Sequence, residues 1–123
     1  MTIKSFTDLN AWQQGHKLVL MIYNASKRFP AEEKFGLTDQ MKRSAISITS
    51  NIAEGFSRNT NKDKCQFYLI AQGSLTELQN QLLIARDVKY LTDNEFHRIA
   101  DQTITVGKLI SGLKRIRNVN TKY

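Results

Sequence analysis

The chain has 123 residues, of which 41% are hydrophobic and 24% charged, and its formal net charge is +7. This length is most simply one domain (1–123), and the apolar fraction excludes a disordered chain. The longest apolar run, residues 18–23, is far shorter than the roughly 20 residues of a membrane-spanning helix. The N-terminal residues lack the layout of a signal peptide, and a single cysteine, Cys65, suits a reducing compartment. We therefore expect a cytoplasmic protein without a membrane partner.

The first predicted helix spans about residues 8–29. Thr7 or Asp8 can cap its start, and Pro30 disfavours helical backbone at the residue before it. Apolar and aromatic side chains recur at helical offsets, which predicts one core-facing stripe. The stripe comprises Leu9, Trp12, His16, Val19, Leu20 and Tyr23.

Three further helices are predicted at about 38–58, 61–89 and 93–117. Thr38 or Asp39 can cap the second, and Thr92 with Glu95 forms a capping box for the fourth. The third and fourth carry heptad-spaced apolar seams, and neither a period-two run nor a hairpin signal indicates a sheet. Four helices joined by short turns predict an all-α fold, an up-down-up-down antiparallel four-helix bundle.

Polar side chains share one face of the second predicted helix and one face of the third. They are Gln40, Arg43, Ser47, Asn51 and Glu54, followed by Ser74 and Glu77. A buried carboxylate needs a partner, and Arg43 is the natural one for Glu54 or Glu77 because guanidinium and carboxylate can pair through two hydrogen bonds. We interpret this set as a structural polar network that fixes helix register or a subunit contact. Nearby small residues, Gly55 and Gly73 among them, are expected to let backbones approach closely.

An enzyme that uses Glu54, Glu77 and Arg43 is the alternative interpretation of the same face. Di-iron bundles need Glu-x-x-His pairs, whereas Glu95 is followed by His97 after only two positions. The sequence has no Gly-rich phosphate loop, no nucleophile elbow and no Cys/His cluster for zinc. We expect no catalytic residues, no metal and no cofactor.

Positive charge gathers in three groups of the sequence. No acidic residue follows Asp101, and the C-terminal group is Lys108, Lys114, Arg115, Arg117 and Lys122. The second group is Lys27 with Arg28, and the third is Arg58, Lys62 and Lys64. Such clusters attract polyanions because binding releases condensed counterions. We predict phosphate contacts to RNA or DNA from the C-terminal group first and from the third group second. The alternative is that basic ends only keep the protein dispersed.

Two segments, FPAEEKFGLTDQMKRSAISITSNIAEG (29–55) and FYLIAQGSLTELQNQLLIA (67–85), carry a family resemblance. They resemble the four-helix-bundle proteins encoded within intervening sequences of bacterial 23S ribosomal RNA genes, also called the S23 ribosomal protein family. That family is similar to the accessory variability determinant of diversity-generating retroelements. The resemblance implies a homo-oligomer, a ring of five subunits, with a basic surface for nucleic acid and no enzymatic activity.

One position departs from the family pattern, because Thr49 stands where the family commonly has proline. Thr49 either leaves the helix straighter or bends it through a hydroxyl bond to a carbonyl one turn back. Together, these observations predict a non-catalytic, homo-oligomeric accessory protein that binds RNA or DNA. A second hypothesis is a scaffold whose partner is another protein and whose positive charge is incidental.

Overall fold

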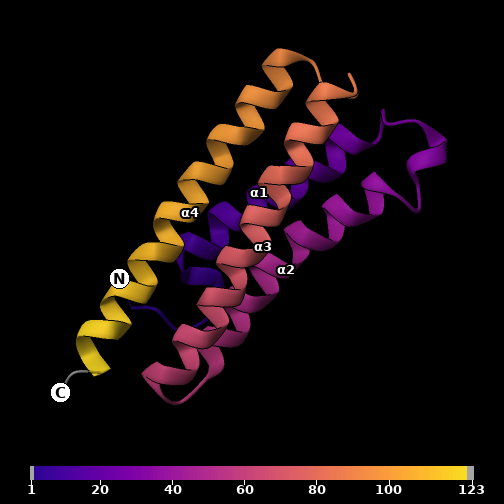
Figure 1. Cartoon of the computed structure of the whole chain (residues 1–123). Coiled ribbons are helices and arrows are strands. Elements are labelled where there is room, and N and C mark those ends of the chain that lie inside the picture. The colour runs from indigo at the N-terminus through magenta and orange to yellow at the C-terminus, as the bar shows by residue number, and fades with distance from the viewer. Residues whose placement is uncertain (1, 122–123) are drawn as a thin grey trace.

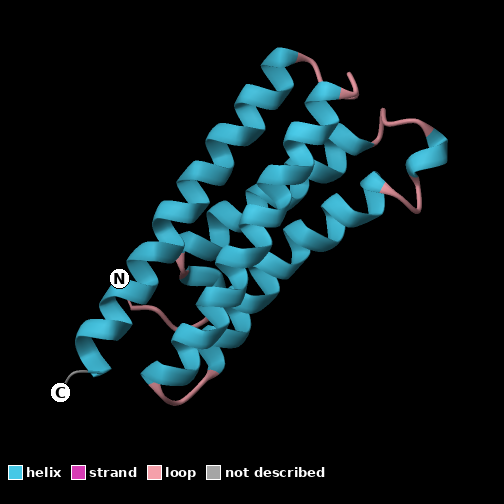
Figure 2. Cartoon of the chain, viewed as in Figure 1, coloured by secondary structure: helices cyan, strands magenta, loops and turns pink. Residues whose placement is uncertain are grey.

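The computed structural model describes the backbone of residues 2–121 and the side chains of residues 2–115. The four helices are α1 (Asn10–Ser26), α2 (Leu37–Ser57), α3 (Asn61–Asp87) and α4 (Asp93–Thr121). Two short 3-10 turns, η1 (Phe6–Asp8) and η2 (Ala31–Glu33), precede α1 and α2. Each helix packs against the next in sequence, and α1 also packs against α4, which closes the antiparallel bundle (Figure 1). The predicted all-α, four-helix bundle is confirmed, and loops lie only at its ends and before α1 (Figure 2).

The core runs along the bundle axis and is filled by aliphatic side chains from all four helices. Each fully buried Leu or Ile stabilises the fold by about 1.5–3 kcal/mol relative to an exposed one. The fully buried members include Leu18, Ile22, Ile48, Ile52, Leu78, Leu82, Ile99 and Ile110.

The predicted core stripe of α1 is wrong in part. Val19 is buried, but His16 is exposed, and Leu20 and Tyr23 are 56% and 39% exposed. The run 18–22 is apolar at every position, so periodicity alone does not select the inward face. The position of Gly15 shows which face of α1 is turned inward. A Cβ on Gly15 would lie 3.0 Å from Thr49 Cγ2, so this face of α1 packs closely against α2. The buried face comprises Ala11, Gly15, Leu18, Val19, Ile22 and Ala25.

Two of the predicted helix caps are also wrong. The Asp8 carboxylate accepts from the backbone N–H groups of Lys4 and Ser5 and so closes η1, and α1 begins after it at Asn10. At α2 the N-cap is Gly36, and no side chain of Thr38 or Asp39 caps the helix. Glu33 does so instead, because its Oε1 accepts the Leu37 N–H at 3.0 Å. The N-cap of α1 is Leu9, which makes no side-chain capping bond, whereas the capping side chain of α2 comes from the preceding 3-10 turn.

The caps of α3 and α4 follow the expected chemistry. Thr60 accepts from the Asp63 N–H at 3.1 Å, one residue before the predicted start of α3. Thr92 and Glu95 form the predicted capping box, with hydrogen bonds of 2.9 and 3.1 Å. Each satisfies N–H groups that a helix start leaves without partners.

Helices α2 and α3 form the most extensive contact in the bundle, and a glycine makes part of it possible. A Cβ on Gly55 would lie 2.5 Å from Cε1 of the fully buried Tyr68. Gly73 does not behave as expected, because no atom lies within 4 Å of its Cβ position. On α2, the Thr49 hydroxyl donates to the Ile46 carbonyl at 3.1 Å, which is the second of the two expectations for this residue. Over the described residues, none of the helices combines the length and apolar character needed to cross a bilayer.

Candidate nucleic-acid interface

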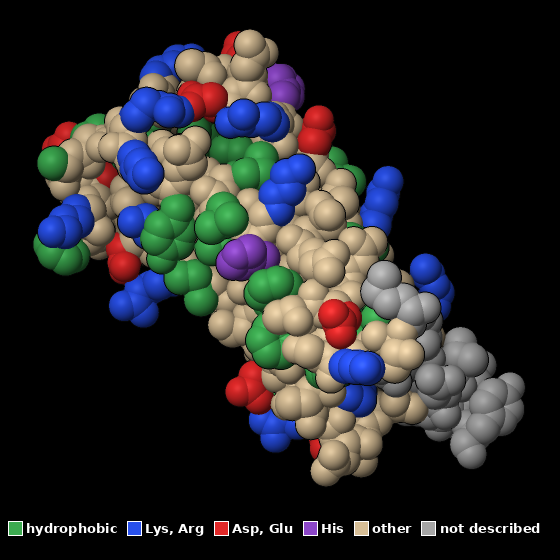
Figure 3. Space-filling view, turned by 180° about the vertical axis from the view of Figure 1, so that it is seen from behind, with side chains coloured by type: hydrophobic (Ala, Val, Ile, Leu, Met, Phe, Trp, Pro, Cys, Tyr) green, Lys and Arg blue, Asp and Glu red, His purple; other side chains and the backbone are tan. Residues whose placement is uncertain are grey.

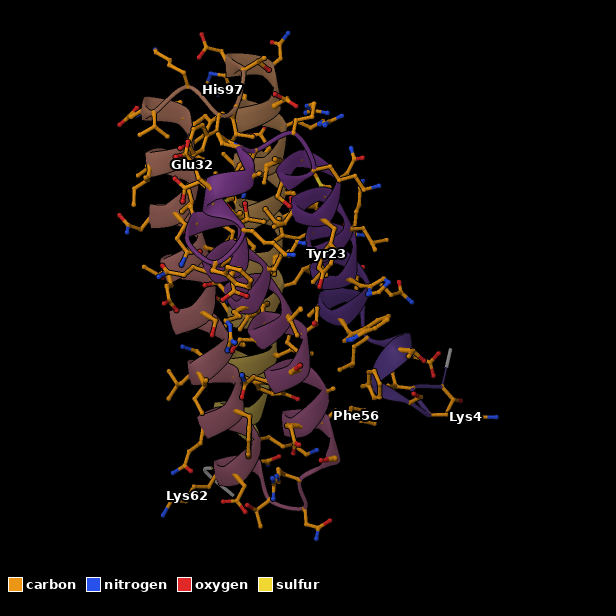
Figure 4. The ribbon with its side chains drawn as sticks, turned by 90° about the vertical axis from the view of Figure 1, so that its right-hand side faces the viewer. Lys4, Tyr23, Glu32, Phe56, Lys62 and His97 are labelled. Carbon is orange, nitrogen blue, oxygen red and sulfur yellow. The ribbon has the colours of Figure 1, made fainter. Side chains whose placement is uncertain are left out.

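The structure brings two of the predicted basic groups to one end of the bundle. Arg58 lies in the α2–α3 turn, Lys62 and Lys64 begin α3, and Lys114 and Arg115 lie toward the far end of α4 (Figure 1). The Cys65 Sγ lies 4.0 Å from the Lys114 carbonyl oxygen, which joins the start of α3 to this part of α4. We call this region, made by Arg58, Lys62, Lys64, Lys114 and Arg115, the basic end, and we include with it Lys108, which lies nearer the middle of α4. Figure 4 places Lys62 at this end and Glu32 and His97 at the opposite one.

Three members of the basic end are engaged with the protein itself. Lys64 Nζ donates to the carbonyls of Phe56 (2.6 Å) and Gly55 (3.3 Å), so it neutralises the negative end of α2. Arg58 pairs with Glu54 at 3.0 Å, and its guanidinium lies 4.5 Å from the centre of the Phe67 ring. Lys114 donates to Gln72 Oε1 at 2.5 Å. These contacts hold the three cations in fixed positions.

The other members project into solvent. Lys62, Lys108 and Arg115 are exposed, and none of them has an ion pair or hydrogen bond among the described side chains. Lys108 and Arg115 are seven residues apart on α4, about 10 Å along one helix face. They line a groove of about 620 Å³ between α3 and α4, together with Gln72, Thr76 and Ser111. Arg117 and Lys122, also predicted as contacts, lie outside the residues whose side chains are described.

The polar side chains of this groove belong to the candidate site, although nothing in the sequence singles them out. Gln72 Nε2 donates to Ser111 Oγ at 2.9 Å, and Gln79 Nε2 donates to Thr103 Oγ1 at 3.1 Å. The seven-residue spacing of Gln72 and Gln79 indicates a shared helix face, but it does not reveal that α4 lies across from it. The basic group at Lys27 and Arg28 lies at the opposite end, where Arg28 pairs with Glu95.

The predicted polar network is present only at its centre. Ser47 and Ser74 share a 2.8 Å hydrogen bond between α2 and α3. Asn51 Nδ2 donates to the Ser47 carbonyl at 2.7 Å and to its hydroxyl at 3.1 Å. These short side chains bridge the helices because the backbones lie close together here.

The expected pairing of Arg43 with Glu54 or Glu77 is wrong. Arg43 pairs with Asp39 and Glu54 with Arg58, both at 3.0 Å and both within α2 or its last turn. The longer side chains lie at the edge of the α2–α3 contact and reach solvent, where pairs four residues apart form readily. Gln40, Arg43, Ser47 and Glu77 instead line a shallow depression of about 240 Å³ together with Ser44.

No group of three His, Cys, Asp or Glu side chains within residues 2–115 is placed to hold a metal ion. The aromatic rings nearest the basic end are already occupied: Phe67 lies against Arg58, and the Lys64 ammonium lies 5.4 Å from the centre of the Phe56 ring. The basic end therefore offers cations, amides and hydroxyls to a ligand.

This geometry defines a small four-helix bundle in which two of the predicted basic groups meet at one end. The profile of the 23S rRNA-intervening sequence protein family matches residues 7–112. The chain therefore belongs to the 23S rRNA-intervening sequence protein family, as the resemblance of its α2 and α3 segments predicts. Comparison with the curated proteins gave no match.

A solved structure has the same fold. It is the 1.70 Å crystal structure of a protein with unknown function from the S23 ribosomal protein family of Bacteroides thetaiotaomicron VPI-5482. The two structures agree with a TM-score of 0.78 over 85% of this chain and 95% of that chain, at 20% sequence identity. At this identity the likeness concerns the fold alone.

Proposed function

We propose that this protein is a non-catalytic, homo-oligomeric accessory protein that binds RNA or DNA through phosphate contacts at the basic end. The observation that carries the proposal is the meeting of cations from the α2–α3 turn, the start of α3 and the distal part of α4. Cations on separate elements can contact several phosphates of one strand at once. The side chains whose hydrogen-bond donors remain available for phosphates are Lys62, Lys108 and Arg115. The sequence resemblance implies a similarity to the accessory variability determinants, and for this reason we propose RNA as the first ligand.

The binding mode follows from what surrounds these cations. Phosphate contacts position a nucleic acid without reading its sequence, and the basic end presents no uncovered aromatic platform within the described residues. Binding is therefore weakly sequence-selective and strongly dependent on salt. An oligomer multiplies such weak contacts on one particle and raises avidity without any new contact.

A salt titration with a single-stranded RNA tests the proposal. Affinity should be measurable near 50 mM salt, and the logarithm of the binding constant should fall linearly with the logarithm of the salt concentration. Absence of binding at this low salt contradicts the proposal, because phosphate-driven association is then at its strongest.

Charge reversal locates the binding surface. Lys108→Glu with Arg115→Glu should abolish binding or lower the salt slope by about two, since each phosphate contact contributes about one. The matched control, Lys34→Glu with Lys89→Glu, changes the net charge equally at the other end of the bundle and should retain binding. Equal loss in both variants indicates a general charge effect. Unchanged binding in the first favours the scaffold hypothesis.

We propose that the subunit contact uses the α2–α3 face, and the family resemblance suggests a ring of five. Gly73 has no atom of this chain within 4 Å of its Cβ position. Ile70, one turn before it, is 52% exposed, and Ile84, on the same helix face three turns later, is 44% exposed. A glycine inside a helix costs up to about 1 kcal/mol, and nothing within this chain approaches it. Ion mobility or light scattering gives the particle mass. Gly73→Arg should lower it, whereas Thr105→Arg on the exposed side of α4 should not.

A further inference from the structure

A second groove lies between α1 and α4, away from the basic end. It has a volume of about 510 Å³, and its lining residues are Lys17, Leu20, Met21 and Asn24 of α1 with Arg98 and Gln102 of α4. The α1 side of the bundle is seen in Figure 3, where hydrophobic side chains lie exposed between those of Lys and Arg. Leu20 is more than half exposed, and Met21 is half-buried against the core. We call it the α1–α4 groove.

Both ends of the α1–α4 groove are closed by contacts that join the two helices. At one end Gln102 Nε2 donates to the Gln14 carbonyl (2.9 Å) and to Gln14 Oε1 (3.0 Å). At the other end Arg28 pairs with Glu95. The stretch of α1 from Gln14 to its last residue, Ser26, is about 18 Å long, and Arg28 follows two residues later. The groove is therefore a bounded site that accommodates a few turns of a helix.

The charges of this groove are of one sign. Lys17 stands on the α1 rim and Arg98 on the α4 rim, and no carboxylate is among the described lining residues. Neither cation has an ion pair or a hydrogen bond within residues 2–115. Helix α1 itself contains no acidic residue. Apolar side chains between two solvent-exposed cations are complementary to a ligand with an apolar centre and carboxylates on both sides.

We propose that the α1–α4 groove is a docking site for an acidic amphipathic helix of another protein. The apolar face of that helix packs on Leu20 and Met21, and its carboxylates pair with Lys17 and Arg98. Asn24 supplies an amide donor at the rim. A helix in a groove is a recurring mode of recognition, with anchors spaced three, four and seven residues apart. The apolar floor and the two isolated cations suit such a helix better than a row of phosphates.

A pair of synthetic peptides tests the charge complementarity. The first is an amphipathic helix of about 14 residues with Leu anchors flanked by Glu, and the second carries Lys at each Glu position. The acidic peptide should bind and the basic one should not, as measured by fluorescence anisotropy. In the variant with Lys17→Glu and Arg98→Glu, the preference should invert, with at least tenfold weaker binding of the acidic peptide. The control variant with Lys34→Glu and Lys89→Glu should keep the original preference.

The methionines provide a readout of position. Met21 lines the groove, whereas Met41 is 1% exposed in the core. With methyl-labelled methionine, the acidic peptide should shift the Met21 signal in a saturable manner and leave Met41 unchanged. Failure of the acidic peptide to bind below about 1 mM, or a shift at Met41 alone, overturns the proposal.

Two other outcomes assign the groove to a different partner. If the Lys17 and Arg98 reversals abolish RNA binding, the groove belongs to the nucleic-acid surface. If they reduce the particle mass, it is a contact between copies of this chain. Either result overturns the proposal that a separate helix docks here. Neither result changes the proposed role of Lys108 and Arg115 in phosphate binding.

Discussion

The Tyr90 hydroxyl donates a 2.8 Å hydrogen bond to Glu33 Oε2, across 57 positions of the chain. The same carboxylate caps α2 through its other oxygen, which accepts the Leu37 N–H. The ring of Phe29, at the end of the α1–α2 connection nearest α1, lies 5.2 Å from that of Tyr90. One carboxylate thus ties the α1–α2 connection to the α3–α4 turn.

The stability of the fold should fall in acid because of this carboxylate. The Leu37 N–H and then the Tyr90 hydroxyl hold the pKa of Glu33 below its ordinary value. A depressed folded-state pKa contributes stability above the unfolded value of about 4.3, and this stability is lost as the pH falls through the folded value. Urea unfolding between about pH 6 and pH 3 should show a shallower pH dependence in Glu33→Gln. Identical profiles in both proteins contradict the assignment.

An alkaline effect is expected from the other partner. The hydrogen bond to Glu33 raises the pKa of Tyr90. A raised folded-state pKa gives stability that is full below the unfolded value of about 10 and is lost as the pH rises through the folded value. Tyr90→Phe removes both the bond and the titration, so its unfolding free energy should be lower near neutral pH and flatter above about pH 9. Comparing the pH profiles of Tyr90→Phe and Glu33→Gln distinguishes the titration of the Tyr90 hydroxyl from that of the Glu33 carboxyl.

Two glycines of the bundle should respond oppositely to alanine. Gly55→Ala places a Cβ 2.5 Å from Tyr68 Cε1 and should cost about 1–3 kcal/mol through overpacking. Gly73→Ala meets no atom of this chain within 4 Å and should stabilise the monomer by about 0.5–1 kcal/mol. Chemical unfolding measures both. A stabilising Gly55→Ala would show that α2 and α3 lie further apart than described.

The turn between α3 and α4 contains a removable strain. Lys89 has φ of 72°, the left-handed conformation that follows many helix C-termini, and Tyr90 N–H bonds back to the Ala85 carbonyl. Glycine is the residue that adopts this conformation without steric cost. Lys89→Gly should therefore raise the unfolding free energy by about 1 kcal/mol, whereas Lys89→Val should lower it. Thermal unfolding distinguishes these effects.

Substitutions at Lys64 and Lys62 should have different effects, the first on the stability of the fold and the second on RNA binding. Lys64 bonds to the last carbonyls of α2, so Lys64→Ala should destabilise the fold by roughly 0.5–2 kcal/mol. Lys62 is exposed, so Lys62→Ala should leave stability within about 0.5 kcal/mol and weaken RNA binding. Equal stability losses in the two variants would contradict the capping role of Lys64.

The sequence predicts the helices well because long periodic segments with few glycines and one proline leave little choice. It does not predict the orientation of α1, since its five consecutive apolar residues at 18–22 offer two faces and only packing against Thr49 selects one. The capping of α2 by Glu33 was likewise not predicted, because Thr38 and Asp39 have the composition of a cap and the decisive residue lies in a preceding turn.

The candidate site is predictable only in its charges. Clusters at residues 58–64 and 108–115 are visible in the sequence, but their meeting at one end depends on the antiparallel arrangement of α2, α3 and α4. Lys64 shows the limit of counting charges, because two backbone carbonyls hold its ammonium. The pairing of Arg43 was mispredicted because helical spacing gives the face of a side chain and not its reach across an interface.

Because the bundle has four antiparallel helices, the C-terminal end of α4 lies at the same end of the bundle as η1 (Figure 1). Phe6 of η1 packs edge-on against Trp12, which fixes the entry of the chain into α1 at that end. A purification tag fused ahead of η1 would therefore lie at the same end of the bundle as Lys62 and Arg115. A polyhistidine tag there would add cations of its own to any RNA titration, and an acidic tag would compete with the RNA. Tag-free protein is thus required for measuring the intrinsic affinity.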